Sequence, residues 1–354
     1  MAISTNVYFG QEWRVGIAEE STFGTAITTQ SNFKELEITA PPQIDFSGVV
    51  RDQRKRADGS RVLDSKDVYL SQVGGEGYTC QIEGILTDIT ADLLLYGAMQ
   101  DIVSEAATSP YLKTFEWDNA TDGDNSGSPF KFFTLDIDNP IAAESEELKT
   151  CVIKTLTISS DPGTNGGRAS FSATFWTGFA PSRNLGTATD PTQWTAPGTD
   201  YYVHQLLKTK TLGGSDLVVG SFSVNFENNV KRVGYDSSGD PQAYVFGPTF
   251  DVTGDLSVKY DANTQNEIDY FITNPEGGSA ERALIIQWGN GTGNGTLKFL
   301  INAIYTGAPN KSFEDKGTFV TIPWQGVTDQ ADGVGTNEAI EVLIANDVDR
   351  VWTA

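Results

Sequence analysis

The chain of 354 residues contains one histidine, His204, so histidine-based catalysis or metal binding depends on that single side chain. A serine hydrolase triad would use it as the general base. The sequence has no Gly-x-Ser-x-Gly turn that would hold a serine nucleophile. We therefore interpret His204 as a structural or surface residue, and we predict no catalytic residue, no metal site and no cofactor.

Two loops have compositions that bind ions or phosphate in other proteins. Residues 118–127 are rich in Asp and Asn, but Ala120 replaces an oxygen ligand of a calcium loop and Pro129 replaces its closing glutamate. Residues 289–295 are rich in glycine but lack the Lys-Ser/Thr pair of a phosphate loop. We interpret the first as a flexible acidic loop and the second as a turn between strands. The 47 Asp and Glu residues make carboxylate pairs common by chance, so no glycosidase pair can be named.

The two cysteines, Cys80 and Cys151, are too few for a disulfide framework or a thiolate zinc site. Both lie in apolar strand patterns, which predicts ordinary buried thiols. The sequence has no run of about 18 apolar residues that would span a membrane. Its first residues lack the basic start and apolar run of a secretory signal. We expect synthesis in a reducing cytoplasm and no membrane insertion.

The formal net charge is −23, from 24 basic and 47 acidic residues. A protein that binds DNA tightly neutralises phosphates with Lys and Arg, so this charge argues against strong DNA binding. The excess acid either keeps the protein soluble or, if the architecture places a polyanion nearby, repels it.

Two short patterns recur in the same order along the chain. The first is an alternating strand that contains Gly84 in one copy and Gly254 in the other, an offset of 254 − 84 = 170 residues. The second recurs at an offset of 326 − 178 = 148 residues. These offsets are near the size of a domain, about 150 residues, and far from the repeat of a solenoid. The sequence therefore predicts two tandem domains of one fold. The second pattern consists of Phe171, Trp176 and Gly178, then Phe319, Trp324 and Gly326.

The elements that carry these patterns are mainly strands, because apolar and polar residues alternate with period two. Each motif strand is followed by a short helix, with Thr87, Asp88 or Thr90 as cap candidates in the first copy. The fold class predicted is all-β with one short helix per domain; an immunoglobulin-type sandwich has little room for that helix. We expect an arm at 1–32, a first domain at 33–180, a linker at 181–212, a second domain at 213–345 and a tail at 346–354. The strands are expected at 78–84, 130–138, 151–159, 170–177, 222–226, 250–258, 283–288, 296–305 and 317–324.

The first domain contains a long basic loop at 49–61 within an acidic protein. It is interpreted as a solvated hairpin tip, as an arm that reaches an acidic neighbouring subunit, or as a direct DNA contact. The tryptophans Trp176 and Trp324 allow a sugar-binding platform, but their shared context favours core or interface packing. The basic residues of the loop are Arg51, Arg54, Lys55, Arg56 and Arg61.

Residues 19–26 resemble the Glu-x-Thr-Tyr-Gly-Thr-Ala segment near the N-terminus of many tail tube proteins of tailed bacteriophages. Residues 152–159 and 169–178, with a glycine-rich turn between them, resemble the paired strands that close that family's domain. Pro323, inside the last strand of the second copy, departs from the pattern, since proline belongs on a strand edge or at a bulge.

The resemblance implies two tandem β-sandwich or barrel domains whose strands join a ring-shaped β-barrel between subunits. A duplicated member is expected to form trimeric, pseudo-hexameric rings, which stack into the hollow tube that conducts DNA into the host. It implies a virion protein of the tail, assembled in the host cytoplasm, that is not an enzyme. Its partners would be further copies of itself and the tail terminator, tape measure and distal tail proteins, while DNA passes without specific binding. An acidic lumen would repel that DNA, and the basic loop and N-terminal arm are the candidates for ring-to-ring contacts.

Two other functions are compatible with the sequence. The first is a phage baseplate or fibre protein, built from β-sandwiches, that binds host-surface carbohydrate. The second is a β-rich hydrolase acting on polysaccharide, which the lack of a nameable catalytic constellation disfavours.

Overall fold

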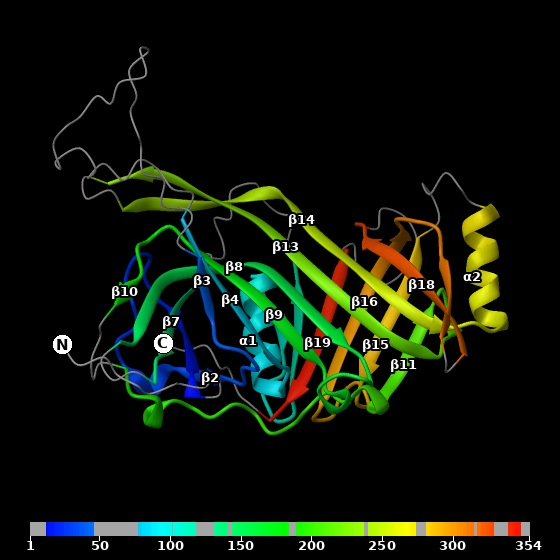
Figure 1. Cartoon of the computed structure of the whole chain (residues 1–354), viewed down its shortest axis with the longest axis horizontal. Coiled ribbons are helices and arrows are strands. Elements are labelled where there is room, and N and C mark those ends of the chain that lie inside the picture. The colour runs from blue at the N-terminus through cyan, green and yellow to red at the C-terminus, as the bar shows by residue number, and fades with distance from the viewer. Residues whose placement is uncertain are drawn as a thin grey trace, which may run out of the picture.

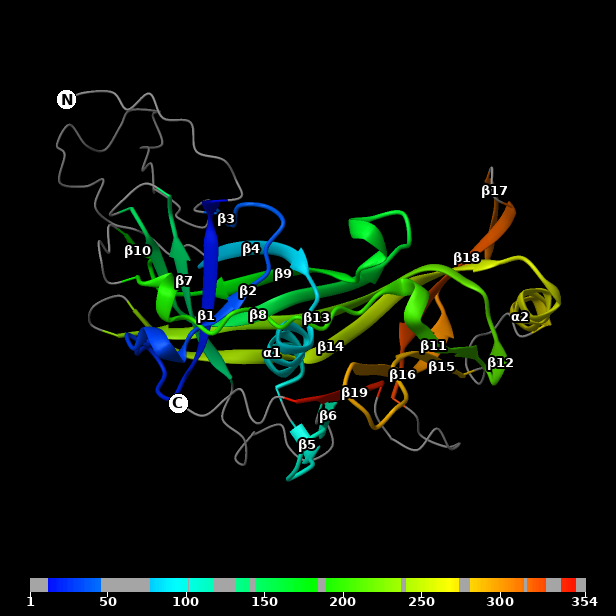
Figure 2. The same cartoon turned by 90° about the horizontal axis from the view of Figure 1, so that it is seen from below.

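The computed structural model describes residues 12–45, 77–100, 102–117, 131–140, 144–183, 189–236, 240–273, 281–314, 317–328 and 339–347 (Figures 1 and 2). We call the elements β1 to β10 the first half and β11 to β19 the second half. The first half contains β1 (Arg14–Glu20), β2 (Lys34–Leu36), β3 (Gln43–Asp45), β4 (Tyr78–Ile85), α1 (Asp88–Met99), β5 (Ile102–Glu105), β6 (Tyr111–Glu116), β7 (Phe132–Asp138), β8 (Glu146–Ser160), β9 (Ser170–Thr177) and β10 (Ser182–Arg183). The second half contains β11 (Leu207–Leu212), β12 (Ser215–Asp216), β13 (Val219–Tyr235), β14 (Pro241–Lys259), α2 (Ala262–Thr273), β15 (Arg282–Trp288), β16 (Thr296–Tyr305), β17 (Asn310–Glu314), β18 (Gly317–Gly326) and β19 (Ile340–Asn346).

An antiparallel sheet, which we call the main sheet, joins the two halves. Its strands follow the spatial order β3, β4, β9, β8, β13, β14, β18 and β17. The sheet passes from the first half to the second at the β8–β13 pair, where Val224 lies opposite Ile158. The two halves therefore share one continuous hydrogen-bonded sheet.

The strands of the second layer follow the order β12, β11, β15, β16, β19, β6 and β5. The end of β16 also pairs with the end of β18, so the sheet turns back beneath itself. Phe222 of β13 lies 5.4 Å from Trp288 of β15 between ring centroids, which places aromatic rings between the two layers. Helix α1 packs against β8 on one side and β19 and β6 on the other.

A smaller sheet, the side sheet, consists of β2, β1, β7, the first part of β8, and β10. Strand β8 therefore belongs to two sheets, and it bends at Thr150, which has a φ of 51°. The buried carboxylate of Glu20 accepts hydrogen bonds from the Thr150 backbone N–H at 2.6 Å and from the Thr134 hydroxyl at 2.7 Å. A strained turn of the chain is thus held by a charge-assisted hydrogen bond.

This part of the chain differs from the predicted arm at 1–32. Residues 14–20 form β1, which lies between β2 and β7 and is buried. Because β1 is covered on both faces, it lacks the alternation that marks a half-buried strand. The predicted linker at 181–212 likewise contains two paired strands, β10 and β11.

The predicted helices and main strands are confirmed. Helix α1 begins after Thr87, whose hydroxyl accepts a hydrogen bond from the Thr90 N–H at 3.2 Å, as an N-cap should. Helix α2 follows β14, as the second copy of the pattern predicts. No helix in the described ranges is long and apolar enough to cross a membrane.

Gly84 and Gly254 lie beneath aromatic rings. A Cβ atom at Gly84 would lie 2.2 Å from the Glu37 carbonyl oxygen and 2.6 Å from the ring of Phe171. At Gly254 it would lie 2.0 Å from the Ser223 carbonyl oxygen and 2.4 Å from the ring of Trp324. Each glycine thus lets a ring from the second pattern pack directly on the motif strand.

The Gly254→Ala substitution should lower the free energy of unfolding by about 3 kcal/mol, because neither the backbone oxygen nor the indole can move without disturbing the sheet. Urea unfolding would measure the change. Gly293→Ala is the control, since nothing lies within 4 Å of its Cβ position, and its effect should stay within about 0.5 kcal/mol. Equal stability of the two variants would contradict this account of Gly254.

Candidate functional site

One face of the main sheet is apolar and buried. Its side chains lie opposite one another from strand to strand, because alternate residues of a strand point to the same face. One such row contains Ile82, Ala173, Leu156, Phe226 and Val252.

The other face of the main sheet, which we call the polar face, carries hydroxyl, amide and carboxylate side chains that are partly or fully exposed. It is the candidate functional site because it is broad, regular and free of large apolar groups over its central strands. One row contains Gln81, Thr174, Thr155, Glu227 and Asp251, and the next contains Glu83, Ser172, Thr157, Asn225, Thr253 and Gln325.

Hydrogen bonds between neighbouring strands satisfy many of these polar groups. The Thr157 hydroxyl donates to the Asn225 side-chain oxygen at 2.9 Å, across the β8–β13 pair. The Ser159 and Ser170 hydroxyls lie 3.1 Å apart across β8 and β9. Since these groups bond to each other, the face offers few free donors to a ligand.

Exposed carboxylates on the polar face include Glu83, Glu227, Asp251 and Asp255, and Asp45 of β3 lies on the same face opposite Thr79. Glu227 lies directly opposite Asp251 on the neighbouring strand. Like charges in this position destabilise a sheet. The cations on this side lie towards the strand ends: Lys259 at the end of β14, and Lys231 in the β13–β14 hairpin, opposite Val245. The centre of the face is therefore acidic even though the arrangement reduces stability.

The groups with possible chemistry are structural. The His204 Nδ1 lies 3.0 Å from the Ser160 hydroxyl and its Nε2 lies 3.1 Å from the Val219 carbonyl oxygen, so the buried ring connects the halves. Cys80 and Cys151 are buried and free, as predicted, and burial raises the pKa of the Cys80 thiol to about 12. Within the described ranges, no group of three His, Cys, Asp or Glu residues could hold a metal ion.

Three of the four aromatic residues of the repeated patterns, Phe171, Trp176 and Trp324, are buried, and Phe319 is partly exposed. This confirms the prediction that Trp176 and Trp324 serve packing and do not form an exposed sugar-binding platform. The pairing of the second pattern differs between halves, since Phe171 lies opposite Gly84 but Trp324 lies opposite Gly254. Gly178 follows β9 and its N–H donates to the Tyr244 hydroxyl at 2.8 Å. Phe319 and Gly326 lie at the two ends of the β14–β18 and β16–β18 pairings, opposite Lys259 and Ala303.

Pro323 lies at the point along β18 where the neighbouring strand changes from β17 to β16. On one side it lies opposite Asp255 of β14. On the other side β17 pairs up to Thr321 and β16 begins to pair at Trp324. The missing N–H therefore falls at a break in the ladder, which is the position that proline favours.

The basic loop at 49–61, with Arg51, Arg54, Lys55, Arg56 and Arg61, lies outside the described residues, as does the acidic loop at 118–127. The second half contains a long hairpin of β13 and β14, whose length the sequence did not indicate (Figure 1). One of its faces packs Val230 and Tyr244 against Trp176 and Phe179. Its opposite face exposes Val233 and Val245.

The Glu227→Gln substitution should raise the free energy of unfolding by about 0.5 kcal/mol, because it removes a like-charge pair. The gain should be smaller in 1 M NaCl, because the Debye length falls to about 3 Å and the repulsion between the two carboxylates is screened. Urea unfolding of the monomer at low and high salt would test this. Glu83→Gln is the control, since Glu83 lies opposite Ser172; a loss of stability in Glu227→Gln would contradict the repulsion.

Comparison with known families agrees with this structure, in which the described residues form a broad acidic sheet face and no catalytic centre. The sequence model of the phage tail tube protein family matches residues 10–341. A search of curated proteins finds no match. We therefore set aside the two alternative functions, a carbohydrate-binding fibre protein and a polysaccharide hydrolase. The chain belongs to the phage tail tube protein family, whose members are non-enzymatic structural proteins that assemble with one another into the tube of the virion tail.

Proposed function

We propose that three copies of this chain form a pseudo-hexameric ring whose inner wall is the polar face, and that such rings stack into a tube conducting DNA into the host. The observation that carries this proposal is the continuity of the main sheet across two halves with matching topology.

The halves repeat the same strand pairings in the same chain order, which supports an internal duplication. Beyond these pairings, each helix carries a tyrosine beneath a cation: Lys131 lies 5.1 Å from the Tyr96 ring and Arg282 lies 4.2 Å from the Tyr270 ring. The pairs β1–β7, β7–β8, β10–β8, β3–β4 and β4–β9 correspond to β11–β15, β15–β16, β19–β16, β13–β14 and β14–β18.

The β8–β13 pair is then the template for the contact between subunits. In the described part of the chain, the main sheet ends at β3, which pairs with β4, and at β17, which pairs with β18. If the second half meets the next subunit as the first half meets the second, its β16–β17 edge joins the β3 edge of that subunit. Head-to-tail contacts of this kind close into a ring, and closure removes exposed strand edges that would otherwise aggregate.

The polar face supplies the inner wall in this arrangement, because its opposite face is the core. Its carboxylates Glu83, Glu227, Asp251 and Asp255 would then line the lumen in each copy. DNA that met lysines or arginines there would bind through its phosphates. An acidic wall instead repels the duplex and leaves it free to move.

The remaining contacts of the tube follow from the same arrangement. The basic residues Arg51 to Arg61 are our candidates for contacts between stacked rings, where a positive segment meets acidic neighbours. The exposed face of the β13–β14 hairpin is its counterpart in the second half. At the ends of the tube, the tail terminator, tape measure and distal tail proteins are the proposed partners.

Electron microscopy of the purified protein tests the ring directly. We expect hollow rods, with three chains in each ring. The Arg54→Glu, Lys55→Glu and Arg56→Glu triple variant should stay folded, as circular dichroism would show, and fail to form long rods because its rings no longer stack. Globular particles from the unmodified chain under all assembly conditions would refute the proposed function, and normal rods from the triple variant would refute the role of the basic loop alone.

Charge reversal tests the lumen. Phages carrying Glu227→Lys and Asp251→Lys should form tubes but retain DNA, because each lysine can neutralise about one phosphate and makes the slope of log affinity against log salt more negative by about 0.9. Time-resolved DNA ejection at several salt concentrations would measure this. Asp200→Lys and Asp216→Lys make the same charge change at exposed residues away from the polar face. Equal ejection rates in both double variants would show that Glu227 and Asp251 do not face the DNA.

A further inference from the structure

We propose that the outer face of α2, formed by Ala262, Asn266, Asp269, Ile272 and Thr273, docks on the first half of a second copy of this chain, beside its strand β10. This inference rests on the proposed ring and names a contact between copies that lies outside the main sheet. It is drawn from the place of α1 within one chain.

Helix α1 lies at the boundary between the two halves, and the second half covers it. At its C-terminal end, the Asn228 side-chain N–H donates to the Ala98 carbonyl oxygen at 2.9 Å. At its N-terminal end, the Asn346 side chain of β19 lies 3.4 Å from the Asp92 carboxylate. Lys113 of β6 forms a buried ion pair with the same carboxylate. The first helix is therefore an interface helix whose partner happens to be the same chain.

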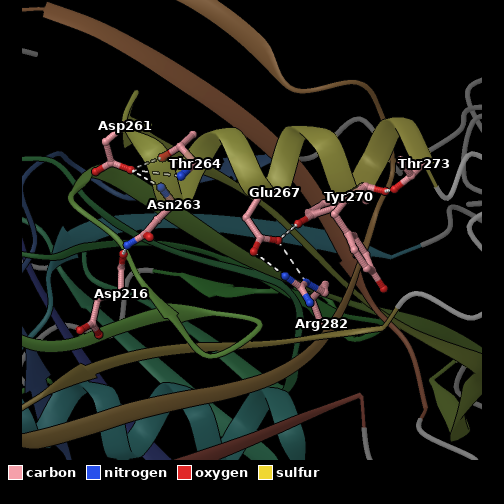
Figure 3. A network of polar contacts seen from close by, with 9 residues as sticks. Asp216, Asp261, Asn263, Thr264, Glu267, Tyr270, Thr273 and Arg282 are labelled. Carbon is pink, nitrogen blue, oxygen red and sulfur yellow. Dashed lines mark hydrogen bonds and ion pairs between the residues drawn. The ribbon is translucent and has the colours of Figure 1, made fainter.

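Helix α2 occupies the corresponding place in the second half. Each helix follows its motif strand and has a side-chain cap, which for α2 is Asp261, whose carboxylate accepts a hydrogen bond from the Thr264 N–H at 3.1 Å. On the inner side of α2, the buried Glu267 forms an ion pair with Arg282 (Figure 3). Its carboxylate also accepts a hydrogen bond from the Tyr305 hydroxyl at 2.5 Å. These contacts attach α2 to Arg282 of β15 and Tyr305 of β16 in its own half.

The outer side of α2 differs from that of α1 because nothing in the described part of the chain covers it. It stands at the far end of the molecule from β10 (Figure 1). Ile272 is 64% exposed, the largest fraction among the exposed large apolar side chains of the described residues. The equivalent face of α1 is buried. If the halves occupy equivalent places around a ring, the partner of this face is the neighbouring copy.

The strand pairings indicate which part of the neighbouring copy contacts the outer face of α2. Strand β19, which contacts α1, pairs with the start of β16; β10 pairs with the start of β8 in the same way. Strand β10 of the next copy therefore takes the place of β19 beside α2. Its Arg183 forms an ion pair with Glu146 at 2.6 Å and still has a side chain 58% exposed, and Asp269 on α2 offers a further charge of opposite sign.

The composition of the two helices agrees with this difference in partner. Helix α1 has three consecutive leucines at Leu93–Leu95 and is covered as soon as the chain folds. Helix α2 must remain soluble until rings form, and its outer face is polar around a single exposed isoleucine. Interfaces that form after folding are more polar than a core.

Disulfide cross-linking of assembled tubes tests the contact. In the Ile272→Cys, Ser182→Cys double variant, oxidation should link chains into dimers and trimers on non-reducing gels, since both positions are exposed and the native cysteines are buried. Each single variant is the control and should give no ladder. Tubes without a ladder in the double variant would overturn this inference and leave the proposed ring intact. If the unmodified chain forms no rings, the proposed function fails, and this inference fails with it.

A second measurement uses substitution at the same place. Ile272→Asp should raise the protein concentration needed for assembly about tenfold, the loss typical of an interface anchor, while Ile272→Leu should leave it unchanged. Leu206→Asp introduces the same charge at another exposed apolar residue, 60% exposed. An equal effect of Ile272→Asp and Leu206→Asp would point to a general charge effect and would overturn the docking site.

Discussion

The antiparallel pairing of β8 with β13 is the interaction on which the rest of this structure depends. It fixes the register between the halves, and a shift of one residue would turn every side chain of one half to the opposite face. With Val224 opposite Ile158, the apolar rows of both halves meet in one core. The same register aligns the polar rows, so a continuous hydroxyl-rich wall follows from a single strand pair. The register is itself held from the side by His204, which joins Ser160 to Val219.

The second layer reinforces the boundary between the halves in a different way. Strand β6, which belongs to the first half, pairs with the C-terminal strand β19, and both cover α1. The buried ion pair of Asp92 and Lys113 is costly to desolvate and is stabilised by the neighbouring Asn346 amide. Removal of one partner would leave a buried charge, so the arrangement favours one mode of packing over others. The first half has this additional hairpin and the described residues of the second half contain no counterpart, so the internal boundary would be stronger than the proposed boundary between chains.

Sequence patterns predicted the strands that alternate and missed those that do not. Strands β9 and β16 were predicted with their observed bounds, and Thr87 was among the cap candidates for α1, because these signals are local. Strand β1 was missed because it is buried on both faces, and β6 with β19 because their pairing joins segments far apart in the chain. The repeated glycines were found as a pattern, but their purpose required coordinates, since a packed ring gives no local signal. The carboxylates of the polar face were not distinguishable among 47 acidic residues until the register placed Glu227 beside Asp251.

In the proposed tube, the composition of the polar face must serve both the repulsion of DNA and the stability of the sheet. A wall that repels DNA benefits from carboxylates, but adjacent strands place opposite side chains about 5 Å apart, where like charges reduce stability. Serine, threonine and asparagine resolve this conflict because they bond to one another across strands, as Thr157 does with Asn225, and present no positive charge. The acidic residues are then few and separated by hydroxyl rows, apart from the Glu227 and Asp251 pair. In the proposed tube, a wall of this kind would repel a polyanion through a sparse set of charges, while the sheet that bears them keeps enough cross-strand hydrogen bonds to remain folded.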